Sequence, residues 1–202
     1  MNLIEKATVI EYHRHRSEKF PRGNVESLGW RSEESQRRRF EVLGGIGELN
    51  GSSVLDIGCG HGDFKGFLDR LASGFTYVGV DNVPEFIGVA QERYGRLANT
   101  HFFNADFSTA TFPEVDFVVA SGALSYRSAV PDFQLAMIEK MFRVARKSLA
   151  FNMLRADRFP PHPLLIGHDP EKVLAYCMSL TTHVRMIKDY LPDDFTIFVN
   201  RT

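Results

Sequence analysis

The chain has 202 residues, of which 44% are hydrophobic, and its formal net charge at pH 7 is −1. This length supports one substantial hydrophobic core, and the balanced charge gives no overall attraction to nucleic acid or to an anionic membrane. The chain contains no run of about 18 apolar residues, the length needed to cross a bilayer, so we expect a cytoplasmic protein. The two cysteines, Cys59 and Cys177, lie far apart without metal-binding spacing, and no metal site is predicted.

The first fifty residues hold nine Lys or Arg and eight Asp or Glu residues, so their basic clusters are locally neutralised. Two helices are expected here, and the second begins near Ser32, where acidic residues follow and favour a helix N-terminus. His13 and His15 have no third ligand beside them, and we interpret them as part of a solvated face. Arg37 and Arg38 are expected to face solvent.

Residues 51–154 alternate short apolar runs with segments of helical period, a pattern typical of a parallel sheet covered by helices on both faces. Apolar stripes predict helices over about 64–71, 83–94 and 135–145, with Asp132 as the N-cap of the third. Strands are expected at 53–57, 75–80, 101–104, 115–120 and 148–154.

The end of the chain has a different pattern. After a loop rich in proline and histidine, Asp169 and Pro170 open a predicted helix. Two extended runs follow, 183–191 and 195–200, joined by a short Pro-Asp-Asp turn. So short a link cannot make a parallel crossover, so we expect an antiparallel hairpin.

A glycine-rich loop follows the first predicted strand. Gly58, Gly60 and Gly62 allow positive φ and a close approach of the backbone to a ligand, and the next helix presents unpaired N–H groups to that loop. The second strand ends on Asp81, where a carboxylate is well placed to accept both hydroxyls of a ribose. Together these features predict a nucleoside cofactor.

The glycine spacing narrows the choice of cofactor. A dinucleotide site needs G-x-G-x-x-G, whereas this loop reads G-x-G-x-G with Asp63 at the third-glycine position, where a carboxylate would repel a pyrophosphate. No Gly-Lys-Ser/Thr follows, which excludes a Walker A loop. Asp56 lies inside the first strand, so its buried carboxylate needs donors or a cation. A positively charged, amino-acid-like ligand would meet that need.

Four segments in order resemble the motifs of the class I S-adenosylmethionine-dependent methyltransferases. The run Val-Leu-Asp-Ile-Gly-Cys-Gly-His-Gly at 54–62 is similar to the first motif, and Asp81 to the ribose-binding acidic position. Phe103-Asn-Ala-Asp-Phe107 is similar to the third, in which Asp106 would accept from the adenine amino group and the Phe107 backbone would donate to the ring. The segment 118–124 matches the region beside the methionine part of the cofactor.

The resemblance implies S-adenosyl-L-methionine as cofactor. Because the family commonly uses its N-terminal helices as a lid, Arg39 would pair with the cofactor carboxylate and Trp30 would cover the pocket; ordinary helix packing is the alternative for both. The full set of expected cofactor-binding residues is Asp56, Gly58, Cys59, Gly60, Asp81, Asn82, Asp106, Phe107, Ser121, Gly122 and Arg39.

The expected fold is α/β: a Rossmann-like, mostly parallel seven-stranded sheet with helices on both faces and a C-terminal antiparallel hairpin. We expect a single methyltransferase domain over residues 1–202. Its parts are an N-terminal helical lid at 1–50, a cofactor-binding core at 51–154, a loop-helix insertion at 155–182 and terminal antiparallel strands at 183–202.

The reaction implied is transfer of a methyl group from the sulfonium by in-line displacement, which requires mainly that acceptor and methyl be aligned. A general base is needed only if the reacting atom carries a proton; Tyr126, His162 or His13 would then serve.

The acceptor is expected to be a small molecule rather than nucleic acid. Ser121-Gly-Ala-Leu124 stands where methyltransferases of nucleic-acid bases often carry Asn/Asp-Pro-Pro-Tyr/Phe, and the chain has no appended RNA-binding module. The alternatives are an RNA or protein methyltransferase and a non-catalytic protein that binds S-adenosylmethionine.

Overall fold

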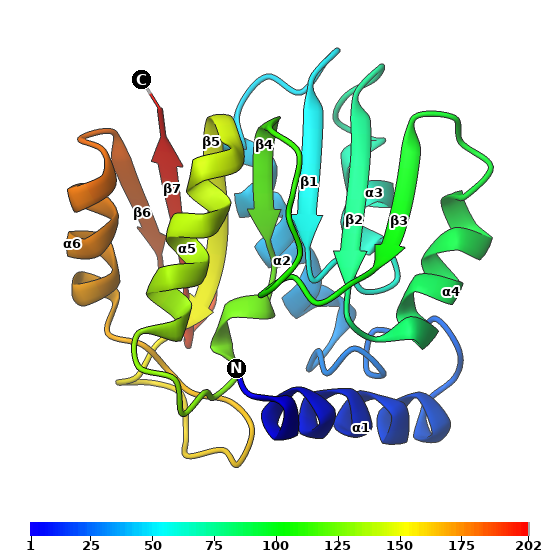
Figure 1. Cartoon of the computed structure of the whole chain (residues 1–202), viewed down its shortest axis with the longest axis horizontal. Coiled ribbons are helices and arrows are strands. Elements are labelled where there is room, and N and C mark those ends of the chain that lie inside the picture. Colours follow the sequence, from blue (N-terminus) through cyan, green and yellow to red (C-terminus); the bar gives the residue numbers. More distant parts are fainter. Residues whose placement is uncertain (202) are drawn as a thin grey trace.

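The computed structural model describes residues 1–201, which form a seven-stranded sheet of order β3-β2-β1-β4-β5-β7-β6 (Figure 1). Strands β1 to β5 pair in parallel, and β7 is antiparallel to both β5 and β6. The predicted sheet with its terminal antiparallel hairpin is thus confirmed. The strands are β1 Ser53–Ile57, β2 Thr76–Asp81, β3 Thr100–Asn104, β4 Val115–Ala120, β5 Ala145–Leu154, β6 Val184–Lys188 and β7 Asp194–Asn200.

Residues 1–201 contain six α-helices and two short 3-10 turns, and the first two helices precede the first strand. Every helix among residues 1–201 is too short or too polar to span a bilayer. The helices are α1 Leu3–Lys19, α2 Glu33–Leu43, α3 Asp63–Leu68, α4 Pro84–Tyr94, α5 Phe133–Val144 and α6 Pro170–Leu180, with turns η1 Gly44–Ile46 and η2 Ala123–Ser125.

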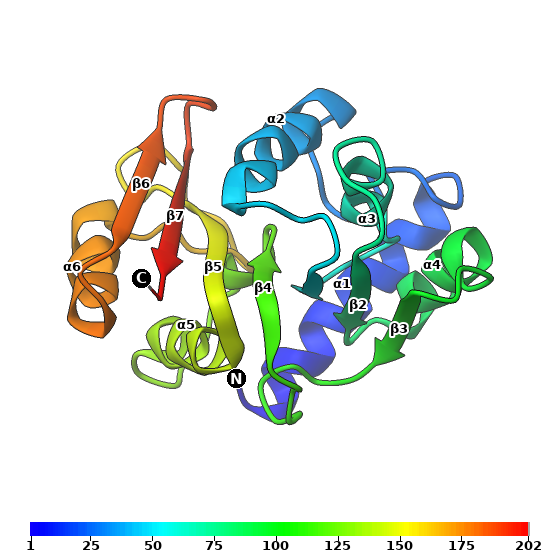
Figure 2. The same cartoon turned by 90° about the horizontal axis from the view of Figure 1, so that it is seen from above.

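The sheet separates two hydrophobic cores because successive strand residues point to opposite faces. Helices α2, α3 and α4 pack with Val54 and Phe117 on one face, and α5 and α6 pack with Leu55 and Val118 on the other. Viewed along the strands, α2 and α3 lie opposite α5 across the sheet (Figure 2). The expected helix cover on both faces is confirmed.

Helix boundaries agree with the sequence in most places. Ser32 caps α2 by accepting from the Ser35 amide, and Asp169 caps α6 by accepting from the Glu171 amide. Asp132 stands at the predicted N-cap of α5, but its backbone is left-handed (φ 52°) and its side chain makes no capping bond. The first predicted helix of the core is too long, because α3 ends at Leu68.

Helix α1 is the element that positions the site. It runs along the edge of the sheet where β1, β2, β3 and β4 end (Figure 1). In open α/β sheets this edge is where ligands bind. Ion pairs tie α1 to that edge, because Lys6 contacts Asp106 beyond β3 and Arg14 contacts Glu85 at the start of α4.

Replacement of Ile197 tests the packing of the terminal hairpin. Ile197 is fully buried in β7, between β5 and β6. We expect Ile197→Ala to lower the free energy of unfolding by about 2–5 kcal/mol, since it leaves a cavity in the core. Urea denaturation measures the change. Met178→Ala on the exposed side of α6 is the matched control, and an equal loss in both variants would contradict the assignment.

Candidate active site

The glycine loop contacts two neighbouring segments, the end of β2 and the η2 turn. Gly58 and Cys59 donate backbone hydrogen bonds to the Val80 carbonyl at 2.8 and 3.1 Å. Gly58 has φ +75°, and a Cβ there would lie 2.7 Å from the Ala123 Cβ. The positive φ and this close approach both require glycine. The loop therefore lies directly over the carboxyl ends of β1 and β2.

Asp81 is held beneath this loop at the end of β2. Its carboxylate accepts from the Gly60 amide at 3.0 Å and from the Val83 amide at 2.9 Å. Burial raises the pKa of Asp81 to about 6, and the bonds from Val83 and Gly60 oppose this rise. Each carboxylate oxygen has capacity for a second hydrogen bond, since an ionised carboxylate offers about four acceptor sites.

Asp56 in β1 is more deeply buried and only half satisfied. Its Oδ2 accepts from the Tyr77 hydroxyl, whereas Oδ1 is buried and has no hydrogen-bond partner among residues 1–201. Burial raises the pKa of Asp56 to about 7, and the negative charge of Asp81 adds to the rise. An unpaired buried carboxylate oxygen is costly. It is therefore a point at which a cationic donor would bind.

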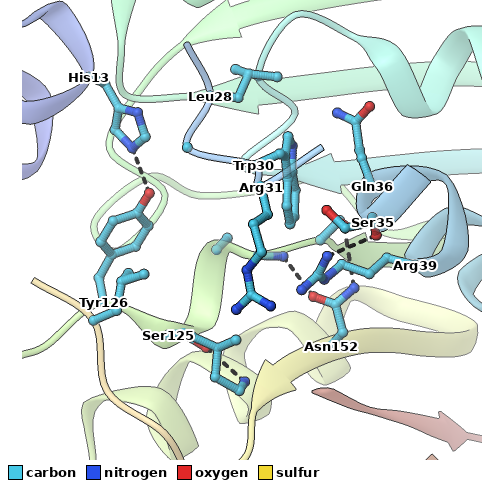
Figure 3. A pocket seen from close by; sticks show the side chains of 18 of the residues that line it. His13, Leu28, Trp30, Arg31, Ser35, Gln36, Arg39, Ser125, Tyr126 and Asn152 are labelled. Atoms are coloured by element: carbon cyan, nitrogen blue, oxygen red, sulfur yellow. Dashed lines mark hydrogen bonds between the residues drawn. The ribbon is translucent and has the colours of Figure 1, made fainter. Parts of the chain in front are cut away.

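A cavity of about 580 Å³ opens beside these carboxylates. Its walls come from the carboxyl edge of the sheet, from the N-terminal segment (residues 1–50) and from the loop after β5; Figure 3 shows part of this lining. The predicted cofactor residues on it are Asp56, Gly58, Cys59, Gly60, Asp81, Asn82, Phe107, Ser121, Gly122 and Arg39, together with the base candidates His13, Tyr126 and His162.

Asp106 departs from the sequence expectation, because it is not part of the cavity lining. Its carboxylate pairs with Lys6 of α1 and accepts from the amide and hydroxyl of Ser108. Burial opposes ionisation, yet the hydrogen bonds from Lys6 and Ser108 lower the pKa of Asp106 to about 2. Its neighbour Phe107 does line the cavity.

Arg39 also has a different partner from the one expected. Its guanidinium forms a buried ion pair with Asp194 at the start of β7 and donates to the Ser35 carbonyl at 2.8 Å. It lies 4.8 Å from the Trp30 ring centroid, and Figure 3 shows the two side chains together. Trp30 does line the cavity. The charge of Arg39 is thus paired with Asp194 within the protein, and its contact with a cofactor carboxylate stays a prediction.

Asp63 explains why this loop differs from a dinucleotide site. Its carboxylate pairs with Arg93 of α4 and accepts from the Gln36 side chain of α2 at 3.0 Å. A negative charge therefore stands at the first residue of α3, where a phosphate would otherwise bind. The carboxylate also joins three helices around the glycine loop.

The histidines of the site have specific hydrogen-bond partners. His13 is 3% exposed, so its placement on a solvated face was wrong; Nε2 lies 2.6 Å from the Tyr126 hydroxyl (Figure 3). His162 uses Nδ1 to accept from the amides of Leu164 and Leu165, which orders the loop after β5. Across residues 1–201, no group of three or more His, Cys, Asp or Glu side chains is arranged to hold a metal ion.

Comparisons with known proteins agree with this geometry. A family model described as a methyltransferase domain matches residues 54–148. A Mycobacterium tuberculosis protein named "Putative methyltransferase Rv1506c" is 28% identical over 157 residues, 74% of this chain and 93% of that protein. Both matches are to methyltransferases, the class of protein that the sequence motifs resemble.

Solved structures share the fold of this chain. Magnesium protoporphyrin IX methyltransferase from Synechocystis PCC 6803, with bound S-adenosylhomocysteine, is 18% identical and has a TM-score of 0.72, covering 98% of this chain and 100% of that one. The N-methyltransferase NodS from Bradyrhizobium japonicum WM9 is also 18% identical, with a TM-score of 0.71 and coverage of 97% and 98%. At these identities the likeness establishes the fold alone.

Sequence reasoning missed Asn152, another residue of the cavity wall. Asn152 in β5 is 1% exposed and lines the cavity; its Oδ1 accepts from the Gly122 amide at 2.8 Å, and its Nδ2 donates to the Ser121 hydroxyl. It fixes the segment after β4. A signal was present, because Asn152 is the one polar residue in the apolar run Leu149–Leu154.

The raised pKa of Asp56 predicts that the stability of the unliganded protein depends on pH. With a pKa of about 7 folded and 3.8 as the reference value, the folded state binds more protons between these values, so stability falls as the pH rises through this range. We expect Asp56→Asn to raise the free energy of unfolding at pH 8, by a few kcal/mol at most, and the gain to shrink toward pH 4. Urea denaturation at both pH values measures it.

The matched control is Asp189→Asn, at a residue whose side chain is 89% exposed. It is expected to leave the pH dependence unchanged. A destabilised Asp56→Asn protein at pH 8 would contradict the assignment of an uncompensated charge.

The Arg39 pair separates a structural role from a ligand-binding role. Removal of one partner of a buried ion pair costs about 3–5 kcal/mol, so Arg39→Met is expected to lower the free energy of unfolding by that amount. Arg38→Met, at an exposed residue of the same helix, is expected to change it by no more than about 0.5 kcal/mol. Full stability in Arg39→Met, with weakened cofactor binding, would instead support a direct contact with the cofactor.

Proposed function

We propose that the cavity binds S-adenosyl-L-methionine and that the protein transfers its methyl group to a small-molecule acceptor. The observation that carries the proposal is the orphaned Oδ1 of Asp56, buried at the cavity wall beside Asp81. The ammonium of the methionine moiety is the donor that Asp56 lacks. Asp81 would accept from the ribose hydroxyls, using the acceptor capacity left by its two backbone bonds.

The charge of the lining supports a cationic cofactor. The cofactor carries an ammonium and a sulfonium against one carboxylate, so its net charge is positive. Among the described residues the cavity is lined by six carboxylates and three guanidiniums. Such a surplus of negative charge favours a cation and disfavours a pyrophosphate. The charged lining residues are Glu26, Asp56, Asp63, Asp81, Asp193, Asp194, Arg16, Arg31 and Arg39.

The contacts proposed for the adenine ring rest on which residues line the cavity and not on their charge. Asn82 and Phe107, which follow Asp81 and β3, line the cavity and supply backbone and ring surface for the base. Asp106 would reach the adenine amino group only if it released Lys6. We therefore propose the Phe107 backbone, and not the Asp106 carboxylate, as the adenine contact of this conformation.

The chemistry requires alignment more than proton transfer. When bound, the sulfonium supplies an activated methyl group. The residues of the chain then hold the acceptor in line with it, and orientation of this kind can contribute about 7–11 kcal/mol. Trp30 and the N-terminal segment cover the cavity and reduce contact with water. The magnesium protoporphyrin IX methyltransferase, which shares the fold, is named for a small-molecule acceptor.

An enclosing N-terminal segment also favours a small molecule over RNA or protein. Arg31 and Arg39 tie residues of this segment to Asp193 and Asp194 across the cavity. We propose that this segment acts as the lid. A polymeric acceptor would have to displace both ion pairs to reach the glycine loop.

Calorimetry with S-adenosylhomocysteine and with NAD tests the cofactor assignment. Saturable binding of S-adenosylhomocysteine without binding of NAD is expected. If the folded protein fails to bind S-adenosylhomocysteine, the proposed function is wrong. Binding without methyl transfer to any acceptor would support the alternative of a non-catalytic binding protein.

Asp81→Asn tests the ribose contact. The variant keeps one oxygen for the Gly60 or Val83 amide but loses the charge that strengthens the ribose bonds. We expect the affinity for S-adenosylhomocysteine to fall by about 1–3 kcal/mol, measured by calorimetry. Asp116→Asn, at the opposite edge of the sheet, is the control and should bind as the wild type does. Unchanged affinity in a folded Asp81→Asn protein would refute the role.

A further inference from the structure

His13 and Tyr126 meet at the wall of the cavity although they lie 113 residues apart in the chain. His13 comes from α1, and Tyr126 follows the η2 turn after β4. Both line the cavity, and Figure 3 shows the imidazole and the phenol pointing toward each other. The proposed cofactor contacts use neither side chain.

The hydrogen bonds define how protons are distributed in this pair. The Nδ1 of His13 faces the Ser27 carbonyl at 3.4 Å, and a carbonyl only accepts, so Nδ1 carries the hydrogen. Nε2 is then the acceptor, and the Tyr126 hydroxyl donates to it at 2.6 Å. The lone pairs of the phenol oxygen remain for a donor in the cavity. Burial lowers the pKa of His13 to about 4, so the imidazole is neutral and its Nε2 lone pair is available to accept a hydrogen bond.

The lining also specifies the charge of the acceptor. Within the described residues each lining arginine already has a partner: Arg31 pairs with Asp193, Arg39 pairs with Asp194, and Arg16 donates to the Glu26 carbonyl. No lining guanidinium is therefore free to bind a carboxylate or phosphate group of the acceptor. We expect an acceptor that lacks such a group.

Three aromatic side chains of the cavity wall favour a flat, apolar acceptor. Tyr12 and Trp30 come from the N-terminal segment, and Phe159 comes from the loop after β5. Aromatic side chains pack well against planar rings in offset or edge-to-face arrangements. The acceptor class that fits both shape and charge is an aromatic ring with a neutral substituent.

We propose that His13 and Tyr126 together accept the proton of a phenolic hydroxyl on an uncharged aromatic acceptor. This inference rests on the proposed cofactor site. As the new O–CH3 bond forms and the S–CH3 bond breaks, the acceptor proton passes to the Tyr126 oxygen and the Tyr126 proton passes to Nε2 of His13. The imidazolium that results keeps Ser27 and Tyr126 as hydrogen-bond partners.

The charge balance explains how a buried histidine can act in this way. Transfer converts the sulfonium to a neutral thioether, so the positive charge that appears on His13 replaces one that disappears from the same cavity. The other charged or titratable groups that influence the pair are Arg16 and Tyr12 on α1, His61 in the glycine loop and Asp81 at the end of β2. Asp81 favours the proton on Tyr126, whereas Arg16 opposes a proton on either member of the pair.

The test uses phenols of different acidity with methyl-labelled S-adenosylmethionine at pH 8. Phenol keeps its proton at this pH and 4-nitrophenol is largely ionised, so only the first needs the pair. We expect Tyr126→Phe and His13→Gln each to lower kcat/KM for phenol by about 10²- to 10⁴-fold and for 4-nitrophenol by less than about tenfold. Affinity for S-adenosylhomocysteine should remain that of the wild type.

The controls are His15→Gln, an exposed histidine of the same helix, and Tyr176→Phe on α6, whose hydroxyl contacts Glu139. Both should leave turnover unchanged. Tyr126→Phe keeps the ring and serves as the test if His13→Gln does not fold. Equal losses for both phenols, or none, would overturn the proton-accepting role. Methylation of benzoate, or of no phenol, would overturn the acceptor class, whereas a wild-type protein that fails to bind S-adenosylhomocysteine would overturn the proposed function itself.

Discussion

Two carboxylates are buried at the ends of adjacent parallel strands, and the rest of the site must supply hydrogen-bond donors or a cation for them. Asp56 pairs with Gly79 in the register of β1 and β2, so Asp81 lies only two residues further along the neighbouring strand. Burial disfavours the charged form of both groups. The glycine loop compensates Asp81 through the Gly60 amide, and Tyr77 compensates one oxygen of Asp56. The other oxygen of Asp56, Oδ1, remains unpaired, and this is the point at which we propose that a cationic ligand binds.

The N-terminal segment is held over the cavity by ion pairs that differ in burial. Arg14 and Glu85 are half exposed, and such pairs contribute about 0–1 kcal/mol and weaken in salt. The Arg39 and Asp194 pair is buried, so it carries a large penalty if broken and fixes where α2 lies. The buried pair therefore fixes α2, whereas α1 is held by exposed and partly buried contacts, among them the pair of Lys6 with Asp106.

Local patterns in the sequence predicted the strands, the glycine loop and Asp81, because each depends on residues close together in the chain. They failed where a side chain finds its partner across the fold. Helix α1 covers a cavity rather than a hydrophobic core, so its inward face includes a polar residue and shows no clear apolar stripe. Spacing therefore gave no sign that His13 is buried. The pairs beyond the reach of local patterns join residues at least 100 positions apart: Lys6 with Asp106, His13 with Tyr126, and Arg39 with Asp194.

The same electrostatics links cofactor binding to turnover. A ligand that binds only the folded state stabilises it in proportion to RT ln(1 + [L]/Kd), so a cation beside Asp56 relieves a cost that the unliganded protein carries. S-adenosylmethionine has one positive charge more than S-adenosylhomocysteine, so we expect the surplus carboxylates of the lining to favour the charged form. Methyl transfer removes that charge from the ligand. If His13 then holds the acceptor proton, the positive charge stays with the protein. The neutral thioether is no longer attracted to the carboxylates of the lining. Departure of the product is therefore favoured over departure of the substrate.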